Sequence, residues 1–392
     1  MKSDIKILIA IESFWDGGAE MFSIRLANQL SLNNQVFFLE LYPYKTNEKR
    51  QIKFLDTNRI KLIQIGKSFL GNFLNNSIKN KNPSNLFIRF LLNIQKKITN
   101  NQVKSIIINY NIDVVNSHSW DTDFNFACLK ERLKFKLVST FHGHYEYLKD
   151  KRINFIRDTN MILSYVDKVI YTSPQHISTL DYFNYPVLKR HKIFYGISID
   201  FAEELTSFKE NETLKIILVA RGIEEKGWEQ AILAVLELLK KYPQRLKLQL
   251  VGDGEYLIAL KNRYGNSQIE FLGYADDVQS LINESHIGLL PTYYSAESLP
   301  NSIIEYLVCG KPVITSNIGA IKQMIEYDGN AAGYCIALKS GKIDINELAE
   351  AIERYLLNID FVKLHSSYAL KAGRQFAMDY CESKYMNVFK MN

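Results

Sequence analysis

Two glutamates, Glu297 and Glu305, are separated by seven residues in a segment that also carries the signals for a helix start and a helix stop. The apolar run 287–290 before them predicts a short buried strand, and the residues that follow are typical of a loop. Pro300 suits the first position of a helix, where its missing N–H removes no hydrogen bond, and Gly310 suits the helix end. We therefore expect Glu297 on the loop and Glu305 on the helix, beyond its first turn.

The start of this predicted helix could bind an anion. The N–H groups near Ser298, Leu299 and Asn301 would have no carbonyl partner within the helix, and the helix dipole favours negative charge there. Carboxylates on either side can accept hydrogen bonds from hydroxyl groups. A ligand with a diphosphate in the middle and hydroxyl-bearing sugars at both ends, such as a nucleotide-sugar, suits this arrangement. The two glutamates are then expected to bind the hydroxyls of one ligand and not to act as a general acid and a general base.

A second candidate anion site follows the apolar run 214–220. Arg221 and Lys226 lie five residues apart in a glycine-containing loop and can contact one diphosphate from two directions. The alternative is a solvated loop whose cations pair with Glu224 and Glu225. Together with the two glutamates described above, the loop favours phosphate binding.

Three motifs in the first half of the chain also follow apolar runs. Gly17 and Gly18 precede a predicted helix and would let the backbone approach a ligand, although a plain glycine turn is the alternative. His118 and His142 could hydrogen-bond a sugar hydroxyl or a phosphate, or transfer a proton near neutral pH. A structural role is equally compatible with His118, whereas Gly143 beside His142 favours a functional one.

No metal or other cofactor is expected. Asp121 and Asp123 could in principle hold a divalent cation, but without further ligands they are more typical of a helix cap or a solvated loop. The four cysteines are far apart and form no Cys-x-x-Cys motif, which favours free thiols over a disulfide or a zinc site. No Gly-x-Ser-x-Gly motif indicates a serine nucleophile.

Both halves of the chain alternate short apolar runs with helical patterns, which predicts an α/β protein with two domains built on parallel sheets. The runs of the first half are residues 5–11, 36–41, 60–65, 114–117, 136–141, 168–172 and 192–195. Those of the second half are residues 214–220, 246–252, 269–272, 287–290, 312–315 and 333–338. Helices are predicted over 228–241 and over about 362–392, and the polar stretch 206–213 is the best domain boundary. All the motifs above follow strand ends, where parallel sheets bind ligands.

The charge of the chain is unevenly distributed. The net charge is +6, but residues 1–200 contain 28 Lys and Arg against 17 Asp and Glu. Segment 57–112 has nine basic residues and no acidic one, mixed with aromatic and aliphatic residues. This composition is equally typical of a face that meets an anionic membrane surface and of a solvated helical face over an ordinary core. Nucleic acid is not an expected partner, because no recognised binding motif accompanies the charge.

The location follows from what the sequence lacks. The chain has no run of about 18 apolar residues and begins without the pattern of a signal peptide. We therefore expect a cytoplasmic protein, peripheral on the inner face of the plasma membrane if the basic segment binds lipid.

Together these motifs resemble the retaining glycosyltransferases of family 4, enzymes of the GT-B fold. The resemblance is densest over 215–338, where it includes Val-Ala-Arg-Gly-Ile-Glu-Glu-Lys-Gly and the two-glutamate segment that ends in Cys-Gly-Lys-Pro. In the first half it is limited to Gly-Gly-Ala-Glu, Ser-His-Ser and Phe-His-Gly. It implies two facing Rossmann-like domains with the active site in the cleft between them. Residues 1–200 would bind the acceptor and 201–369 the donor, and a C-terminal helix, about 370–392, would pack back on the first domain.

The resemblance also implies a role for each motif. Arg221 and Lys226 would hold the donor diphosphate, while Glu297 would bind hydroxyls of the donor sugar and Glu305 the ribose. The other donor contacts would come from Gly17, Gly18, Gly273, Tyr274, Ser298, Leu299 and Asn301. His142 would touch the donor sugar near the reacting carbon, and His118 would lie on the acceptor side.

The sequence departs from the family pattern at three positions. Ser298 stands where glycine is frequent, Gln323 where a carboxylate is usual, and Ser198 where aspartate is common. None of these removes a predicted diphosphate ligand, so we expect activity.

The expected reaction is metal-independent transfer of a sugar, with retention, to a hydroxyl of a glycan or lipid-linked acceptor in surface polysaccharide synthesis. The donor would be a UDP-hexose or a UDP-N-acetylhexosamine. The alternatives are a nucleotide-sugar epimerase or hydrolase on the same fold, and a non-catalytic protein that binds nucleotide-sugars.

Overall fold

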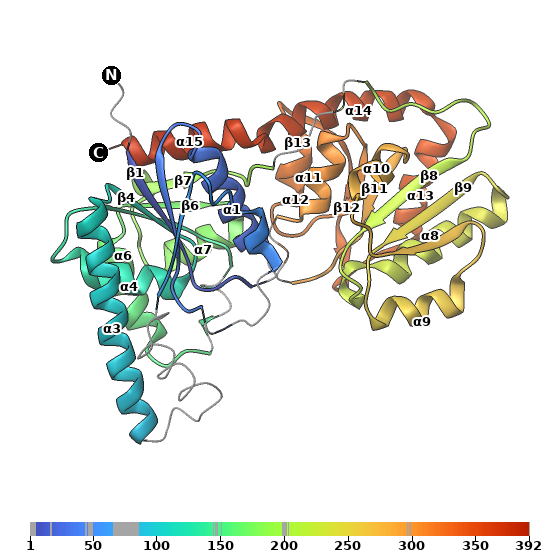
Figure 1. The fold of residues 1–392 in the computed structure, drawn as a ribbon. Helices are drawn as coiled ribbons and strands as arrows, with labels where there is room; N and C mark the ends of the chain where they lie inside the picture. Colours follow the sequence, from blue (N-terminus) through green and yellow to red (C-terminus); the bar gives the residue numbers. More distant parts are fainter. Residues whose placement is uncertain are drawn as a thin grey trace. The chain divides into compact units, whose positions relative to one another are not determined.

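The computed structural model of the chain contains two compact units, which Figure 1 colours along the sequence. The first consists of Met1–Gly196 and Met378–Asn392, and the second of Ile197–Ala377. The structure describes residues 5–15, 18–43, 45, 50–65, 86–143, 145, 148–149, 151–197, 202, 204–295, 297 and 299–391. Each unit is an α/β domain built on a parallel sheet.

The first unit has a seven-stranded sheet in the order β3-β2-β1-β4-β5-β6-β7, and every neighbouring pair is parallel. Its strands are β1 (Lys6–Ile11), β2 (Gln35–Glu40), β3 (Lys61–Gln64), β4 (Val114–Ser117), β5 (Lys136–Thr140), β6 (Lys168–Tyr171) and β7 (Arg190–Lys192). Its α-helices are α1 (Gly18–Leu30), α3 (Leu86–Tyr110), α4 (Trp120–Lys130), α6 (Phe155–Tyr165), α7 (Pro174–Tyr182) and α15 (Met378–Lys390). Short 3-10 helices occur at η1 (Arg50–Phe54) and η2 (Val187–Lys189).

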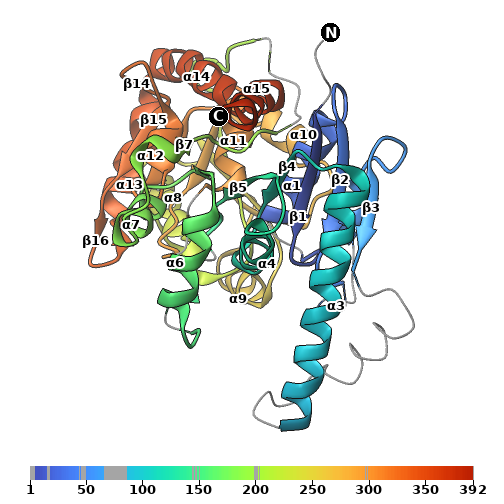
Figure 2. The same cartoon turned by 90° about the vertical axis from the view of Figure 1, so that its left-hand side faces the viewer.

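Helices cover both faces of this sheet because the strand order reverses at β1. Strands β2 and β3 extend from β1 in one direction, and β4 to β7 in the other. Right-handed crossovers then place α1 on one face and α3, α4, α6 and α7 on the opposite face. In agreement, α1 packs against α15, while α4 packs against both α3 and α6 (Figure 2).

The second unit has a six-stranded parallel sheet in the order β10-β9-β8-β11-β12-β15. Its strands are β8 (Leu214–Val219), β9 (Leu246–Val251), β10 (Ile269–Gly273), β11 (Ile287–Leu290), β12 (Val313–Ser316) and β15 (Gly333–Ile336). Two antiparallel hairpins pair β13 (Glu326–Tyr327) with β14 (Asn330–Ala331), and β16 (Leu338–Lys339) with β17 (Lys342–Ile343).

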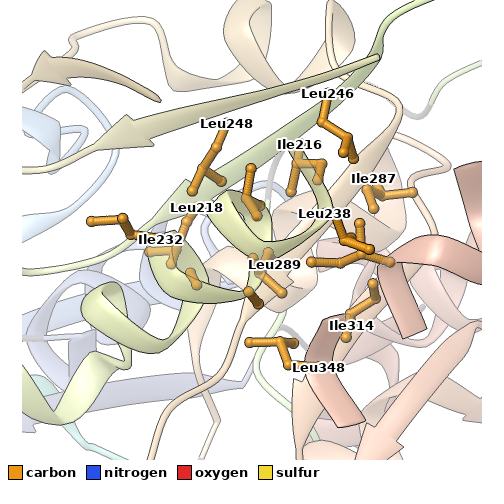
Figure 3. Close-up of a cluster of buried hydrophobic side chains, with 14 of the residues drawn as sticks. Ile216, Leu218, Ile232, Leu238, Leu246, Leu248, Ile287, Leu289, Ile314 and Leu348 are labelled. Atoms are coloured by element: carbon orange, nitrogen blue, oxygen red, sulfur yellow. The ribbon is translucent and has the colours of Figure 1, made fainter. Parts of the chain in front are cut away.

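The helices of the second unit differ widely in length. They are η3 (Glu224–Lys226), α8 (Trp228–Lys241), α9 (Glu255–Tyr264), α10 (Val278–Asn283), α11 (Asn301–Val308), α12 (Ile321–Ile325), α13 (Ile345–Leu357), α14 (Ile359–Gly373) and η4 (Arg374–Phe376). Helix α8 turns one apolar stripe toward the sheet, since Ile232, Val235 and Leu238 are buried. Figure 3 shows this stripe beside aliphatic side chains of the neighbouring strands, such as Leu218 and Leu248.

The predicted fold class is confirmed, and most predicted strands match observed ones to within two residues at each end. The helix predicted over 228–241 is α8, with the same limits. The strand predicted over 192–195 is wrong, because β7 pairs with β6 only over Arg190–Lys192. The apolar residues that follow β7 pack against α15, where the carbonyl of Phe194 accepts a hydrogen bond of 3.3 Å from Sγ of Cys381.

The C-terminal segment also differs from its prediction. Two helices, α14 and α15, replace the single helical segment predicted over about 362–392. Between them Ala377 is extended and forms an isolated parallel bridge with Ile197, so no helix can continue through it. The two short hairpins were not predicted, because strands of two residues have no recognisable periodicity.

Each sheet reverses its strand order at one place, and the loops of Arg221, Lys226, Glu297 and His118 follow the strands at these places, whereas His142 follows β5 and Tyr274 follows β10. In the second unit the reversal lies between β8 and β11, and in the first between β1 and β4. Crevices at such reversals are where open parallel sheets bind ligands, because the neighbouring loops diverge there. The topology therefore brings the loop of Lys226 beside the loop of Glu297.

A glycine beneath an aromatic ring seats α11 on the second sheet. Gly288, in β11, has no side chain, and a Cβ placed there would lie 2.3 Å from the ring of Tyr306. The buried ring occupies this space, and its hydroxyl accepts a hydrogen bond of 2.8 Å from the N–H of Val219 at the end of β8. This contact fixes the helix that carries Glu305 relative to the strand that leads to Arg221.

Replacing this glycine should loosen the seat of α11. We expect Gly288→Ala to lower the free energy of unfolding of the second unit by about 1–3 kcal/mol, because the added methyl overpacks the ring. Chemical unfolding of Gly288→Ala, Tyr306→Leu and the double variant measures the effect. Gly288→Ala should lower the free energy of unfolding less in the Tyr306→Leu background than in the native protein. Equal losses in the two backgrounds would contradict the steric explanation.

Candidate active site

A buried ion pair joins the two loops at the strand reversal of the second unit. Nζ of Lys226 bonds Oε2 of Glu297, and each side chain is only 8% exposed. Oγ1 of Thr292 lies 3.1 Å from the same carboxylate oxygen. Buried charges persist when they are paired and hydrogen-bonded, so both loops are held by this contact.

The loop after β8 can approach β11 because of one glycine. Gly227 has φ +79°, and a Cβ there would lie 2.1 Å from the carbonyl oxygen of Pro291. It ends η3 and precedes α8, so Lys226 is the last residue before the close approach. The N–H of Tyr293 donates to the carbonyl of Glu225 at 2.8 Å, which fastens the two loops through their backbones.

The ring of Tyr294 is close to both predicted phosphate ligands. Its ring centroid is 5.4 Å from Cζ of Arg221 and 5.1 Å from Nζ of Lys226. Arg221 is exposed and forms no ion pair with any residue that the structure describes. The predicted alternative, in which the loop cations pair with Glu224 and Glu225, is wrong, because Glu224 instead pairs with Lys342 at 3.1 Å.

Helix α11 begins one residue later than predicted. Pro300 is its N-cap in an extended conformation, and Asn301 is the first helical residue. Glu297 lies on the preceding loop, and Glu305 is half-buried on the helix beyond its first turn, as expected. Leu299 is buried between them.

The remaining predicted donor residues of the second unit lie on another loop. Gly273 ends β10 with φ +72°, and Tyr274 after it is 73% exposed. Ser298 lies outside the residues that the structure describes. In the first unit Gly18 is the first residue of α1. Gly17 of the first unit and Ser198 of the second also lie outside the described residues.

The two predicted histidines of the first unit contact one another. Nδ1 of His118 lies 2.9 Å from Nε2 of His142, and Nε2 of His118 lies 2.8 Å from Oδ1 of Asn116. Nδ1 of His142 bonds the hydroxyl of Tyr195. His118 is fully buried, and this burial lowers its pKa from the usual range to about 3. Phe22 stacks on Tyr195 with ring centroids 4.4 Å apart.

The aspartates considered for a metal both have protein partners. Asp121 accepts a hydrogen bond of 3.0 Å from Arg152, and Asp123 accepts from the hydroxyls of Ser139 and Tyr145 at 2.6 and 2.7 Å. They lie in the first turn of α4, which Ser119 caps. Within the described part of the chain, no three His, Cys, Asp or Glu side chains are grouped so as to hold a metal ion.

Two family models match most of this chain. Residues 17–200 match "Glycosyltransferase Family 4", and residues 213–358 match "Glycosyl transferases group 1". The chain belongs to glycosyltransferase family 4. It is therefore a glycosyltransferase of a retaining family.

Individual relatives are distant in sequence, and the share of the chain that they cover differs. An uncharacterized glycosyltransferase of Methanocaldococcus jannaschii is 24% identical over 301 residues, which cover 71% of this chain and 75% of the relative. The amylovoran biosynthesis glycosyltransferase AmsK of Erwinia amylovora is 28% identical over 134 residues, 32% of each protein. The crystal structure of Anabaena HepE in complex with UDP has a TM-score of 0.73 at 16% identity and covers 98% of this chain and 99% of HepE. The fold is accordingly GT-B.

The basic segment 57–112 is only partly described. Residues 57–65 and 86–112 are included, and 86–110 form α3. None of the helices in the described part of the chain combines the length and the apolar character that a membrane crossing requires.

Four residues that contact the Lys226–Glu297 pair or the two histidines were not predicted as site residues. Thr292 and Tyr294 share a loop with Glu297, but the sequence gives no sign that one binds the glutamate and the other lies against two cations. Asn116 could have been found, because residues two apart on a strand face the same way and it precedes His118 by two. Tyr195 could not, since it follows another strand and meets His142 only through the fold.

The contributions of Lys226 and Glu297 to the free energy of unfolding should be strongly coupled. We expect Lys226→Met and Glu297→Gln each to lower the free energy of unfolding by about 3–5 kcal/mol, because each leaves a buried partner unpaired. The double variant should cost clearly less than the sum of the two. Chemical unfolding of the three proteins measures this.

An exposed pair provides the control for this cycle. Lys241 and Glu353 lie 2.7 Å apart with side chains 64% and 24% exposed. Lys241→Met and Glu353→Gln should show a coupling below about 1 kcal/mol. A coupling between Lys226 and Glu297 no larger than this would refute the stabilising role of the buried pair.

Proposed function

We propose that this glycosyltransferase moves a sugar from a nucleoside-diphosphate donor, a UDP-hexose or UDP-N-acetylhexosamine, to a hydroxyl of a glycan or lipid-linked acceptor. The observation that carries the proposal is the Lys226–Glu297 pair, together with Arg221, which approaches the same Tyr294 ring as Lys226. It combines cations for a diphosphate with a carboxylate for sugar hydroxyls. The crystal structures of HepE with UDP and with UDP-glucose support a uridine donor.

The hydrogen-bond inventory of the pair supports two separate roles in donor binding. An ammonium group has three N–H donors, and Glu297 takes one of those of Lys226, which leaves two for phosphate oxygens. Lys226 and Thr292 both bond Oε2 of Glu297, and no residue that the structure describes bonds Oε1. Oε1 can therefore accept hydrogen bonds from the donor sugar.

We assign the remaining donor contacts on the family pattern. Arg221 would bind the diphosphate, Glu305 the ribose, and the loop of Gly273 and Tyr274 the base. The backbone N–H groups of Ser298, Leu299 and Asn301 would contact phosphate, and Gly17 and Gly18 would lie opposite it. His142 would contact the donor sugar near the reacting carbon, and His118 would lie on the acceptor side.

The reaction we propose needs no metal. The acceptor oxygen forms the new bond to the anomeric carbon on the face from which the diphosphate leaves, and the departing phosphate oxygen accepts the acceptor's proton. Arg221, Lys226 and the start of α11 would stabilise the negative charge that develops on the diphosphate. Retention of configuration follows from attack and departure on the same face.

The acceptor is proposed to belong to surface polysaccharide synthesis, and the name of AmsK supports this direction. The basic segment 57–112 would attach the enzyme to anionic lipid at the inner face of the plasma membrane, where a lipid-linked acceptor is available.

Donor binding can be measured directly. We expect UDP-sugars to raise the thermal stability of the protein, since ligand at about 100 times its dissociation constant adds about 2.7 kcal/mol to the folded state. GDP-sugars should bind more weakly. If no nucleotide or nucleotide-sugar in the panel shifts the transition, the donor site proposed here is wrong.

Turnover distinguishes the proposed transfer from its alternatives. We expect Arg221→Ala to reduce transfer by roughly a hundredfold, because a preorganised cation at the diphosphate is lost. Its stability should change by less than about 0.5 kcal/mol, since the side chain is exposed. Lys240→Ala, on a side chain that is 74% exposed on α8, is the matched control and should keep full activity. Donor consumption without any acceptor would indicate an epimerase or hydrolase, and binding without turnover a non-catalytic protein.

A further inference from the structure

Four side chains of the first unit form one hydrogen-bonded array. It runs from Asn116 through His118 and His142 to Tyr195, and each link is a direct contact between ring nitrogens, an amide oxygen or a hydroxyl. A histidine has two distinct nitrogens, and the partner of one decides which of them carries the proton. The proton positions of the whole array can therefore be derived from its fixed end.

Asn116 is the fixed end. Its Nδ2 donates to the carbonyl oxygen of Val138 at 3.1 Å and lies 3.0 Å from Oγ1 of Thr140. Because a carbonyl oxygen can only accept, the amide must point its NH₂ group toward Val138. Oδ1 then faces His118 and can only accept, so Nε2 of His118 must carry a hydrogen.

The assignment propagates to His142. His118 is fully buried and its lowered pKa, which results from that burial, keeps it neutral. With its hydrogen on Nε2, the Nδ1 of His118 has only a lone pair to offer. Nε2 of His142, 2.9 Å away, must therefore donate to it.

Tyr195 occupies the last position. When His142 is neutral its Nδ1 has a lone pair, and the hydroxyl of Tyr195 donates to it. If His142 gains a proton, the same hydroxyl can turn toward the carbonyl oxygen of Phe141, 3.4 Å away, and accept from Nδ1. Nε2 of His142 carries a hydrogen in both states.

We propose that Asn116 and Tyr195 are positioning residues, of which Asn116 fixes His142 with a hydrogen on Nε2 and Tyr195 covers its Nδ1, so that this histidine acts as a hydrogen-bond donor and not as a general base. Asn116 sets the proton position through His118, and Tyr195 covers the remaining lone pair. A ligand oxygen that replaces His118 as the partner of Nε2 would have to be an acceptor. The role of His142 in transfer rests on the proposed function, whereas the proton positions do not.

Nitrogen-15 correlation spectra of the imidazole rings report the proton positions in the free protein. The chain has seven histidines, so His118→Asn and His142→Asn identify the two signals of interest. We expect both rings in the native protein to carry their hydrogen on Nε2. A native His142 with its hydrogen on Nδ1 and a bare Nε2 would overturn the proposal.

Two variants separate the two positioning residues. In Asn116→Ala, keeping the hydrogen on Nε2 of His118 would bury an unpaired N–H, so we expect both rings to shift together toward Nδ1–H. In Tyr195→Phe the hydrogen should stay on Nε2 of His142, because Asn116 still sets it. Asn125→Ala truncates another buried asparagine of this unit and should leave both rings unchanged.

The outcomes bear on the proposal in different ways. Unchanged proton positions in Asn116→Ala would overturn the role of Asn116. A hydrogen that leaves Nε2 of His142 in Tyr195→Phe would show that Asn116 does not set the proton position by itself. If Asn116→Ala does not fold, the spectra of the native protein and of Tyr195→Phe still show whether His142 carries its hydrogen on Nε2. Among folded variants, kcat of Asn116→Ala should fall about tenfold, the loss of roughly one hydrogen bond. If kcat is unchanged although the protons have shifted, His142 has no role in the reaction. If the protein binds no nucleotide-sugar, the proposed function is wrong, but the proton positions assigned to the array still hold.

Discussion

The contact between Lys226 and Glu297 requires two loops from neighbouring strands to be placed accurately, and the structure around it meets this requirement. An ammonium and a carboxylate that are both buried are stable only while they remain paired. The pair thus depends on the strand reversal between β8 and β11, which brings the loops together, and on Gly227, which allows their backbones to touch. Helix α11 is seated by the contact of Tyr306 with Gly288, so Glu305 is placed by the same strand.

In the first unit, the predicted site residues His118 and His142 are held in place by neutral hydrogen-bonding groups. Two histidines, an asparagine and a tyrosine form hydrogen bonds with one another in an array that contains no carboxylate and in which only His142 is half-exposed. Burial makes a charged His118 unfavourable, so the array orders its hydrogens through amide and hydroxyl partners. In both units, groups that would meet a ligand are held by partners before any ligand arrives, which reduces the cost of ordering them on binding.

Much of the architecture could be predicted from the sequence. Strand β11 contains no polar side chain because both faces of a parallel sheet are covered, and it has the predicted limits. Helix α8 has an unmistakable apolar stripe. Short elements without periodicity could not be found, such as the hairpin of β13 and β14. The break at Ala377 depends on its bridge to Ile197, a contact far along the chain.

The sequence by itself determined which residues follow strand ends, and therefore that Arg221, Lys226 and Glu297 share one edge of a sheet. It also determined the family, because the spacing of these residues is a local pattern. Only the tertiary structure decided the partners: Lys226 binds Glu297, not Glu224 or Glu225, and His142 lies between His118 and Tyr195. The physical reason is that hydrogen bonds and ion pairs depend on distances of a few ångströms between residues far apart in the sequence, such as Lys226 and Glu297, which are 71 positions apart. Such distances are set by strand order and close glycine contacts, which no local pattern encodes.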